Sequence, residues 1–153
     1  MLDNNRQAFF ALIRAGLWAD ANLDLDDRVD WDKVYQLAEE QSVIGLVLAG
    51  IERLKNANLH LGLDQELLLQ WIGEVQMLEQ QNKVMNEFVA KLIEKLRKKD
   101  VYAILVKGQG IAQCYDRPLW RASGDVDLLL SEENYLRVVI NVSKNVNFVE
   151  GAA

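Results

Sequence analysis

Two aspartates set two residues apart, Asp125 and Asp127, are the residues best suited to carry chemistry. They open the run Gly124-Asp125-Val126-Asp127-Leu128-Leu129-Leu130, which we interpret as a strand too apolar for the surface. Residues i and i+2 of a strand point to the same face, so both carboxylates would converge on one spot. Neighbouring acids repel each other unless a cation lies between them, and Mg²⁺ takes one or two carboxylates together with water and substrate phosphates. The spacing is as consistent with a magnesium site as with the alternative, in which Asp125 caps a turn and Asp127 points to solvent.

A glycine turn, Lys107-Gly108-Gln109-Gly110, is the second feature that could serve chemistry. It follows an apolar stretch and precedes a short helix, so its backbone N–H groups could face a phosphate, with Lys107 adding a positive charge. By itself such a turn more often only reverses the chain. It is neither a Walker loop nor a dinucleotide fingerprint.

Three single residues lie close to these two features. Arg121, four residues before Asp125, could pair with an acid or clamp a phosphate, or form an ordinary surface ion pair. Trp120 could stack on a nucleobase, although packing against the core is the more common role of such a tryptophan. Cys114, on the short helix between the strands, is expected to be a buried hydrophobic residue.

The elements that must position these residues follow from the hydrophobic periodicity, which predicts an α+β protein with a helical N-terminal region. In that region, at 1–99, we expect an amphipathic first helix and a second helix that begins at Trp31 with Asp30 as its N-cap. A third helix is expected over 43–55. Residues 64–99 form one long helix or two nearly collinear ones.

From residue 100 to 153 the pattern predicts a small mixed sheet with helices, an α/β core that is incomplete at its C-terminal end. Strands are expected at 101–106, 124–130 and 146–149. Short helices are expected at 111–115 and after Ser131, which is placed to act as an N-cap.

Composition limits the kind of partner. The 153 residues include 23 Asp and Glu against 17 Lys and Arg, for a net charge of -6. A surface of that sign argues against general binding to nucleic-acid backbones, which needs clustered cations. The first residues carry no secretory pattern, the apolar runs are too short to cross a bilayer, and the single cysteine fits a reducing compartment. We therefore expect a cytoplasmic protein with no membrane partner.

Taken together, the motifs are more specific than any one of them. The run Ile104-Leu105-Val106-Lys107-Gly108, then Tyr115, Pro118, Arg121 and the Asp125-Val126-Asp127-Leu128-Leu129 strand, resembles the uncharacterised nucleotidyltransferase family. That family belongs to the DNA polymerase β-like nucleotidyltransferase superfamily and shows a strand ending in Leu-Lys-Gly, an Arg, and an Asp-x-Asp strand. The resemblance covers about residues 100–150, and more loosely the helical stretch before them.

The resemblance implies transfer of a nucleoside monophosphate from a nucleoside triphosphate to an acceptor, with release of pyrophosphate. Asp125 and Asp127 would be the catalytic residues that hold Mg²⁺. Lys107, Gly108, Gln109 and Arg121 would bind the nucleotide. Gln109 departs from the family pattern, because the superfamily has a small or hydroxyl residue at this place in the turn. The charge of the chain favours a small molecule or a protein over a nucleic acid as the acceptor.

A second departure from the superfamily concerns catalysis. The superfamily supplies a third carboxylate from a later strand, and the context of Glu150 does not match one. We therefore expect either a piece of a longer enzyme or a short form with impaired catalysis. The competing hypotheses are a catalytically incomplete nucleotide-binding module and a protein-interaction module. In the latter the helical half forms an interaction or homodimerisation surface and the α/β part is only structural.

Overall fold

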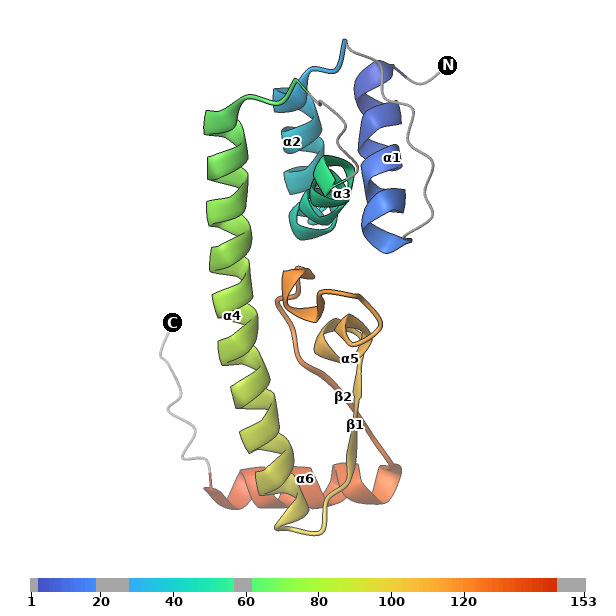
Figure 1. Ribbon diagram of the computed structural model, residues 1–153. Coiled ribbons are helices and arrows are strands. Elements are labelled where there is room, and N and C mark those ends of the chain that lie inside the picture. The colour runs from blue at the N-terminus through green and yellow to red at the C-terminus, as the bar shows by residue number, and fades with distance from the viewer. Residues whose placement is uncertain (1–2, 19–27, 57–61, 146–153) are drawn as a thin grey trace, which may run out of the picture.

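The computed structural model describes residues 3–18, 28–56 and 62–145 (Figure 1). Four helices come first: α1 (Asn4–Leu17), α2 (Trp31–Glu40), α3 (Ile44–Asn56) and α4 (Gln65–Arg97). Strand β1 (Ala103–Val106), helix α5 (Gly108–Ala112), the 3-10 helix η1 (Pro118–Trp120), strand β2 (Asp127–Leu130) and helix α6 (Glu132–Asn145) follow. A mostly helical chain with a small sheet confirms the α+β class.

The main hydrophobic core lies between α1, α2, α3 and the N-terminal part of α4. Helices α1 and α3 approach closely through glycines, since a Cβ at Gly16 would lie 2.2 Å from the Leu46 carbonyl oxygen and one at Gly50 would lie 2.3 Å from that of Leu12. Trp71 brings α4 into this core, where it is fully buried and donates its indole N–H to the Ile44 carbonyl at 3.1 Å. The apolar faces predicted for these segments are thus buried against one another.

The two predicted helix N-caps, Asp30 before α2 and Ser131 before α6, are confirmed. The Asp30 carboxylate accepts the Lys33 backbone N–H at the start of α2. The Ser131 hydroxyl accepts the Asn134 backbone N–H at 3.3 Å at the start of α6. These side chains satisfy donors that the first turn of a helix leaves without an intrahelical acceptor.

Helix α4 is a single helix of 33 residues, which settles the choice between one helix and two. At 1.5 Å per residue it is roughly 50 Å long. Its first part packs on α3, its middle contacts η1, and its last part continues past the sheet (Figure 1). It is therefore the element that the N-terminal helices and the segment between β1 and β2 share.

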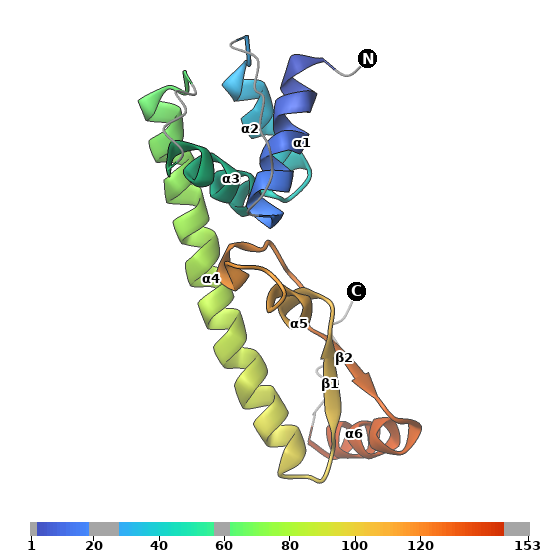
Figure 2. The ribbon, with the colours of Figure 1, turned by 45° about the vertical axis from the view of Figure 1, so that its right-hand side comes forward.

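The sheet consists, in the described part of the chain, of β1 and β2 paired antiparallel, with Val106 opposite Asp127 and Ala103 opposite Leu130. The sheet lies between α5 and α6 (Figures 1 and 2): β2 runs away from the N-terminal helices toward α6, and β1 runs in the opposite direction. The strand expected at 146–149 lies outside the described residues, so the predicted mixed sheet remains a prediction.

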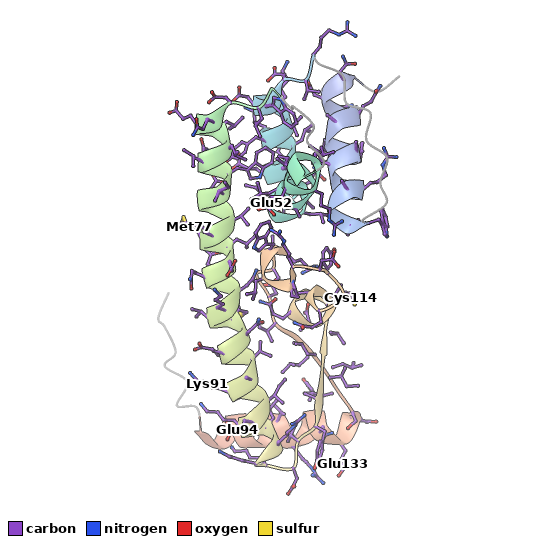
Figure 3. All side chains as sticks on the ribbon, viewed as in Figure 1. Glu52, Met77, Lys91, Glu94, Cys114 and Glu133 are labelled. Carbon is purple, nitrogen blue, oxygen red and sulfur yellow. The ribbon has the colours of Figure 1, made fainter. Side chains whose placement is uncertain are left out.

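Three local predictions were wrong. The second strand begins at Asp127 and not at Gly124, because β1 ends at Val106 and leaves nothing for the preceding residues to pair with. The short helix begins at the glycine turn, where Ile111 N–H already donates to the Lys107 carbonyl, and not at Ile111. Cys114, expected to be buried, is exposed in the turn that follows this helix (Figure 3).

In the described residues no helix is long and apolar enough to cross a bilayer.

Candidate functional site

Asp127 and Lys107 meet at the end of the two-stranded sheet. Asp127 is the first residue of β2, opposite Val106, and Lys107 follows Val106 directly. Lys107 Nζ lies 4.0 Å from Asp127 Oδ2, and the two side chains are 74% and 43% exposed. An ion pair this exposed contributes little to stability, so both groups remain accessible to a ligand.

Asp125 lies outside the strand and is exposed. The alternation rule that predicted two carboxylates on one strand face therefore does not apply to this pair. Its backbone is nonetheless held against the glycine turn: a Cβ at Gly108 would lie 3.0 Å from the Asp125 carbonyl oxygen. The structure thus brings the turn and the acidic segment together through main-chain packing.

The glycine turn itself has a strained backbone at Lys107. This residue has φ +53° and ψ -155°, and Gly108 follows with φ +31°. A side chain at such angles costs about 1–3 kcal/mol, because that region is open essentially only to glycine. The residue nevertheless presents its ammonium group next to Asp127, and strain of this kind concentrates at functional sites.

Arg121 reaches back to the same turn. Its Nη1 donates to the carbonyl oxygens of Gly108 and Ala122, both at 3.3 Å. Among the residues that the structure describes, it pairs with no carboxylate, so the surface ion pair considered from the sequence is not formed there. A guanidinium has five N–H donors, and most of those of Arg121 remain available to an anion.

Gln109 does not point its side chain toward a ligand. It is 4% exposed, and its amide donates to Asn82 Oδ1 at 3.1 Å while its carbonyl oxygen accepts the Ser123 hydroxyl at 3.0 Å. The side chain is therefore part of the interior that supports the turn. This side chain is therefore not available to a ligand.

Asn82 of α4 is the centre of this interior network and was not among the residues predicted from the sequence. It is 2% exposed and donates to the carbonyls of Leu119 and Arg121 at 2.7 and 2.8 Å. Its own oxygen accepts from Gln109. One amide thus fixes the turn, the loop after η1 and the approach to Asp125.

A signal for Asn82 was present in the sequence. One stripe of α4, whose members are buried or half-buried, passes at alternating spacings of four and three through Trp71, Val75, Leu78, Asn82, Met85 and Val89. A polar residue on an apolar helix face needs an internal hydrogen-bond partner, so its position predicts a buried polar contact.

Trp120 is held on two sides. Its indole N–H donates to Glu79 Oε2 at 3.1 Å, and the Arg117 guanidinium lies 4.0 Å from the ring centroid. The Lys83 ammonium, and after it this indole N–H, hold the pKa of the Glu79 carboxyl below its ordinary value. Trp120 also packs against the main core, which is the more common of its two expected roles.

Asp125 and Asp127 are the two carboxylates that the sequence predicts as ligands of a divalent cation. No cluster of three or more His, Cys, Asp or Glu side chains forms a metal site within those residues. Asp125 and Asp127 are oxygen donors of the kind that Mg²⁺ uses when water and substrate phosphates complete its shell. The donor set fits such an ion, and it does not fit a cage made of protein ligands alone.

The fold and the site define an α+β protein in which a strand, a glycine turn and a short helix lead to an acidic second strand. A model of the family described as uncharacterised nucleotidyltransferase matches residues 27–141, and the chain belongs to this family. A search of curated proteins found no match, and a search of solved structures found none either.

Proposed function

We propose that the protein transfers a nucleoside monophosphate from a nucleoside triphosphate to an acceptor, with Mg²⁺ as cofactor. The observation that carries the proposal is the joining of three features at one place: the Lys107–Gly108 turn, the Asp125 backbone against it, and Arg121 bonded to the Gly108 carbonyl. Family membership supports the same class of reaction.

In this proposal the turn receives the triphosphate. The backbone N–H groups of Gly108 and Gln109 face the phosphate oxygens, and Lys107 and Arg121 supply the positive charge. Asp125 and Asp127 hold the divalent ion and are the catalytic residues. That ion supplies charge stabilisation at the transferring phosphoryl group.

The chemical step is a displacement at the α-phosphorus. The acceptor oxygen forms a new bond to that phosphorus, the bond to the bridging oxygen breaks, and pyrophosphate leaves. The proton of the acceptor hydroxyl passes to a carboxylate or to solvent at this exposed site. What the chain contributes is position and charge, which is the larger part of catalysis in phosphoryl transfer.

We further propose a division at about residue 99, with helices before it and the nucleotidyltransferase-like core after it. The net charge of -6 favours a small molecule or a protein over a nucleic acid as the acceptor. A cytoplasmic location fits the single cysteine.

A second candidate is a catalytically incomplete module that binds a nucleotide or another protein. The observation in its favour is that the described residues place no third carboxylate beside Asp125 and Asp127. In this case the helical region would serve interaction, including formation of a homodimer.

The test is calorimetric titration of ATP into the protein with and without Mg²⁺, followed by an assay of pyrophosphate release. Asp125→Asn and Asp127→Asn should abolish the Mg²⁺-dependent part of binding. Glu87→Gln, which removes one exposed carboxylate of α4, is the matched control and should leave binding unchanged. Binding without pyrophosphate release with any acceptor tested favours the incomplete nucleotide-binding module. Absence of Mg²⁺-dependent binding overturns both nucleotide-binding candidates and leaves the protein-interaction module.

A further inference from the structure

A cleft of about 290 Å³ lies between the N-terminal helices and the segment that joins α5 to β2. One wall comes from the end of α1, the turn before α3 and α3 itself, and the other comes from residues 115–117 and 120–122. The joining segment lies under α3 and beside α4 in both ribbon views (Figures 1 and 2). The volume is at the lower end of the range for small-molecule sites.

The charge inside this cleft is opposite to that of the chain. Three arginines line it, together with two acids. Both acids are already paired, Asp116 with Arg53 and Glu52 with Arg117, the latter at 2.5 Å. Glu52 is marked on α3 in Figure 3. The positive charge that these pairs leave over belongs to Arg121, whose contacts in the described structure are to carbonyl oxygens.

The rest of the lining is largely uncharged. Val43, Leu46 and Ala49 present apolar surface from the N-terminal side. An occupant that matches this wall has a compact apolar or flat body with a single anionic group directed at Arg121. A guanidinium binds such a group through charge-assisted hydrogen bonds, which are stronger than neutral ones.

Arg121 also connects the cleft with the glycine turn. It lines the cleft and at the same time donates to the Gly108 carbonyl. A molecule bound in the cleft therefore lies next to the place where the proposed triphosphate binds. An acceptor needs that proximity, whereas a remote effector does not.

We infer that the cleft is the acceptor site, and that the acceptor is a small molecule carrying a carboxylate or a phosphate beside an apolar or flat body. This inference rests on the proposed nucleotidyl transfer. It assigns recognition of the acceptor to α3 and to residues 115–122, which lie before Asp125 in the chain.

The test uses two anionic probes, benzoate and phenyl phosphate, and the neutral probe benzyl alcohol. Binding is followed by two-dimensional NMR of the ¹⁵N-labelled protein, at the Trp120 indole and the Ala49 amide. We expect both regions to shift, with the anionic probes binding about tenfold more tightly than benzyl alcohol. The ratio of the two anionic affinities distinguishes a carboxylate acceptor from a phosphate acceptor.

Two pairs of variants locate the probes. Ala49→Leu fills the cleft and should weaken both anionic probes about tenfold or more, whereas Ala90→Leu, on an exposed position of α4, should not. Arg121→Gln should abolish the preference for the anionic probes, and Arg121→Lys should retain part of it. The Arg121 pair keeps the test decisive if Ala49→Leu fails to fold.

Addition of ATP and Mg²⁺ separates this inference from the proposed function. We expect the probe and the nucleotide to bind together, since the five N–H donors of the Arg121 guanidinium are enough to contact both anions. Displacement of the probe by ATP would show that the cleft binds the base of the nucleotide. Equal affinities of the charged and neutral probes would show that Arg121 does not recognise the anionic group. Either result overturns the inference and leaves nucleotide binding unaffected. Probe binding without any Mg²⁺-dependent nucleotide binding overturns the proposed function, and the acceptor role with it.

Discussion

Asn82 and Gln109, separated by 26 residues in the chain, meet in the interior through a hydrogen bond of 3.1 Å between Gln109 Nε2 and Asn82 Oδ1. This bond joins the middle of the long helix α4 to the first turn of α5. Because α5 begins at the glycine turn, the contact sets where that turn lies relative to the rest of the molecule. Both residues are almost fully buried, so the bond is exchanged for water only if the structure opens.

Replacing Asn82 tests the role of this amide. Asn82→Leu restores the apolar stripe of α4, yet it leaves the carbonyls of Leu119 and Arg121 without their donor. Each buried group left unsatisfied costs about 1–3 kcal/mol, so the free energy of unfolding should fall by roughly 2 kcal/mol or more. Urea denaturation measures this change. Gln81→Leu, at the exposed neighbouring position, is the control, and equal stability of the two variants would contradict the role given to Asn82.

Replacing Lys107 tests the backbone strain in the turn. Lys107→Gly should raise the free energy of unfolding by about 1 kcal/mol, because glycine adopts the observed angles without strain but loses more entropy on folding. Lys107→Ala removes the same ammonium group and retains the strain, so it should bring no such gain. Thermal denaturation of the three proteins checks the order. A stabilised alanine variant would show that the charge, and not the backbone, is the source of the effect.

The Tyr35 hydroxyl makes the free energy of unfolding depend on pH in the alkaline range. Burial first, and then its hydrogen bond to the Glu74 carboxylate, raise the pKa of Tyr35 to about 12. In the unfolded chain a tyrosine titrates near pH ~10. The stabilisation is therefore fully present below pH ~10 and is lost as the pH rises from there toward 12.

Tyr35→Phe isolates this effect. The stability difference between wild type and Tyr35→Phe should be constant below pH ~10 and should then change in favour of the variant as the pH increases. Chemical denaturation at a series of pH values measures it, and the phenolate absorbance of the folded proteins gives the pKa directly. A Tyr35 that titrates with the exposed tyrosines would refute the prediction.

The Glu79 carboxylate, which accepts the Trp120 indole N–H, makes the stability of the protein depend on pH in the acidic range. The Lys83 ammonium and the Trp120 indole N–H lower the pKa of this carboxyl in the folded state. The resulting stabilisation is present above the unfolded pKa of a glutamate and is lost as the pH falls through the lower, folded value. Glu79→Gln should therefore remove part of the acid dependence of stability, and the tryptophan fluorescence of the variant should respond less to acid. Glu87→Gln, on the same helix, should behave like wild type in both measurements.

Local features of this fold could be predicted from the sequence, and non-local ones could not. Asp30 and Ser131 cap helices because each side chain needs only a backbone donor three residues away. The exclusion of Asp125 from β2 depends on where β1 ends, which the strained angles of Lys107 decide. No pattern around the aspartates contains that information.

The candidate site shows the same contrast. The glycine turn, Arg121 and the two aspartates were found as motifs, and the structure places them in one region. The direction of the Gln109 side chain was not foreseen, because it depends on Asn82 in a helix 27 positions earlier. Arg121 was expected to meet an acid or a phosphate, and its bond to the Gly108 carbonyl follows from the path of a loop that periodicity does not describe.

Two ion pairs join α3 to the loop between α5 and η1, and the order of their charges determines the register of the loop against the helix. Glu52 and Arg53 are consecutive on the helix, and their partners Arg117 and Asp116 are consecutive on the loop, in the opposite sense of charge. A slip of the loop by one residue would set Glu52 against Asp116, or Arg53 against Arg117, and the attraction would become repulsion. The two ion pairs thus favour a single register of the loop against α3. Arg121 lies four residues after Arg117, so this register also determines where Arg121 is placed.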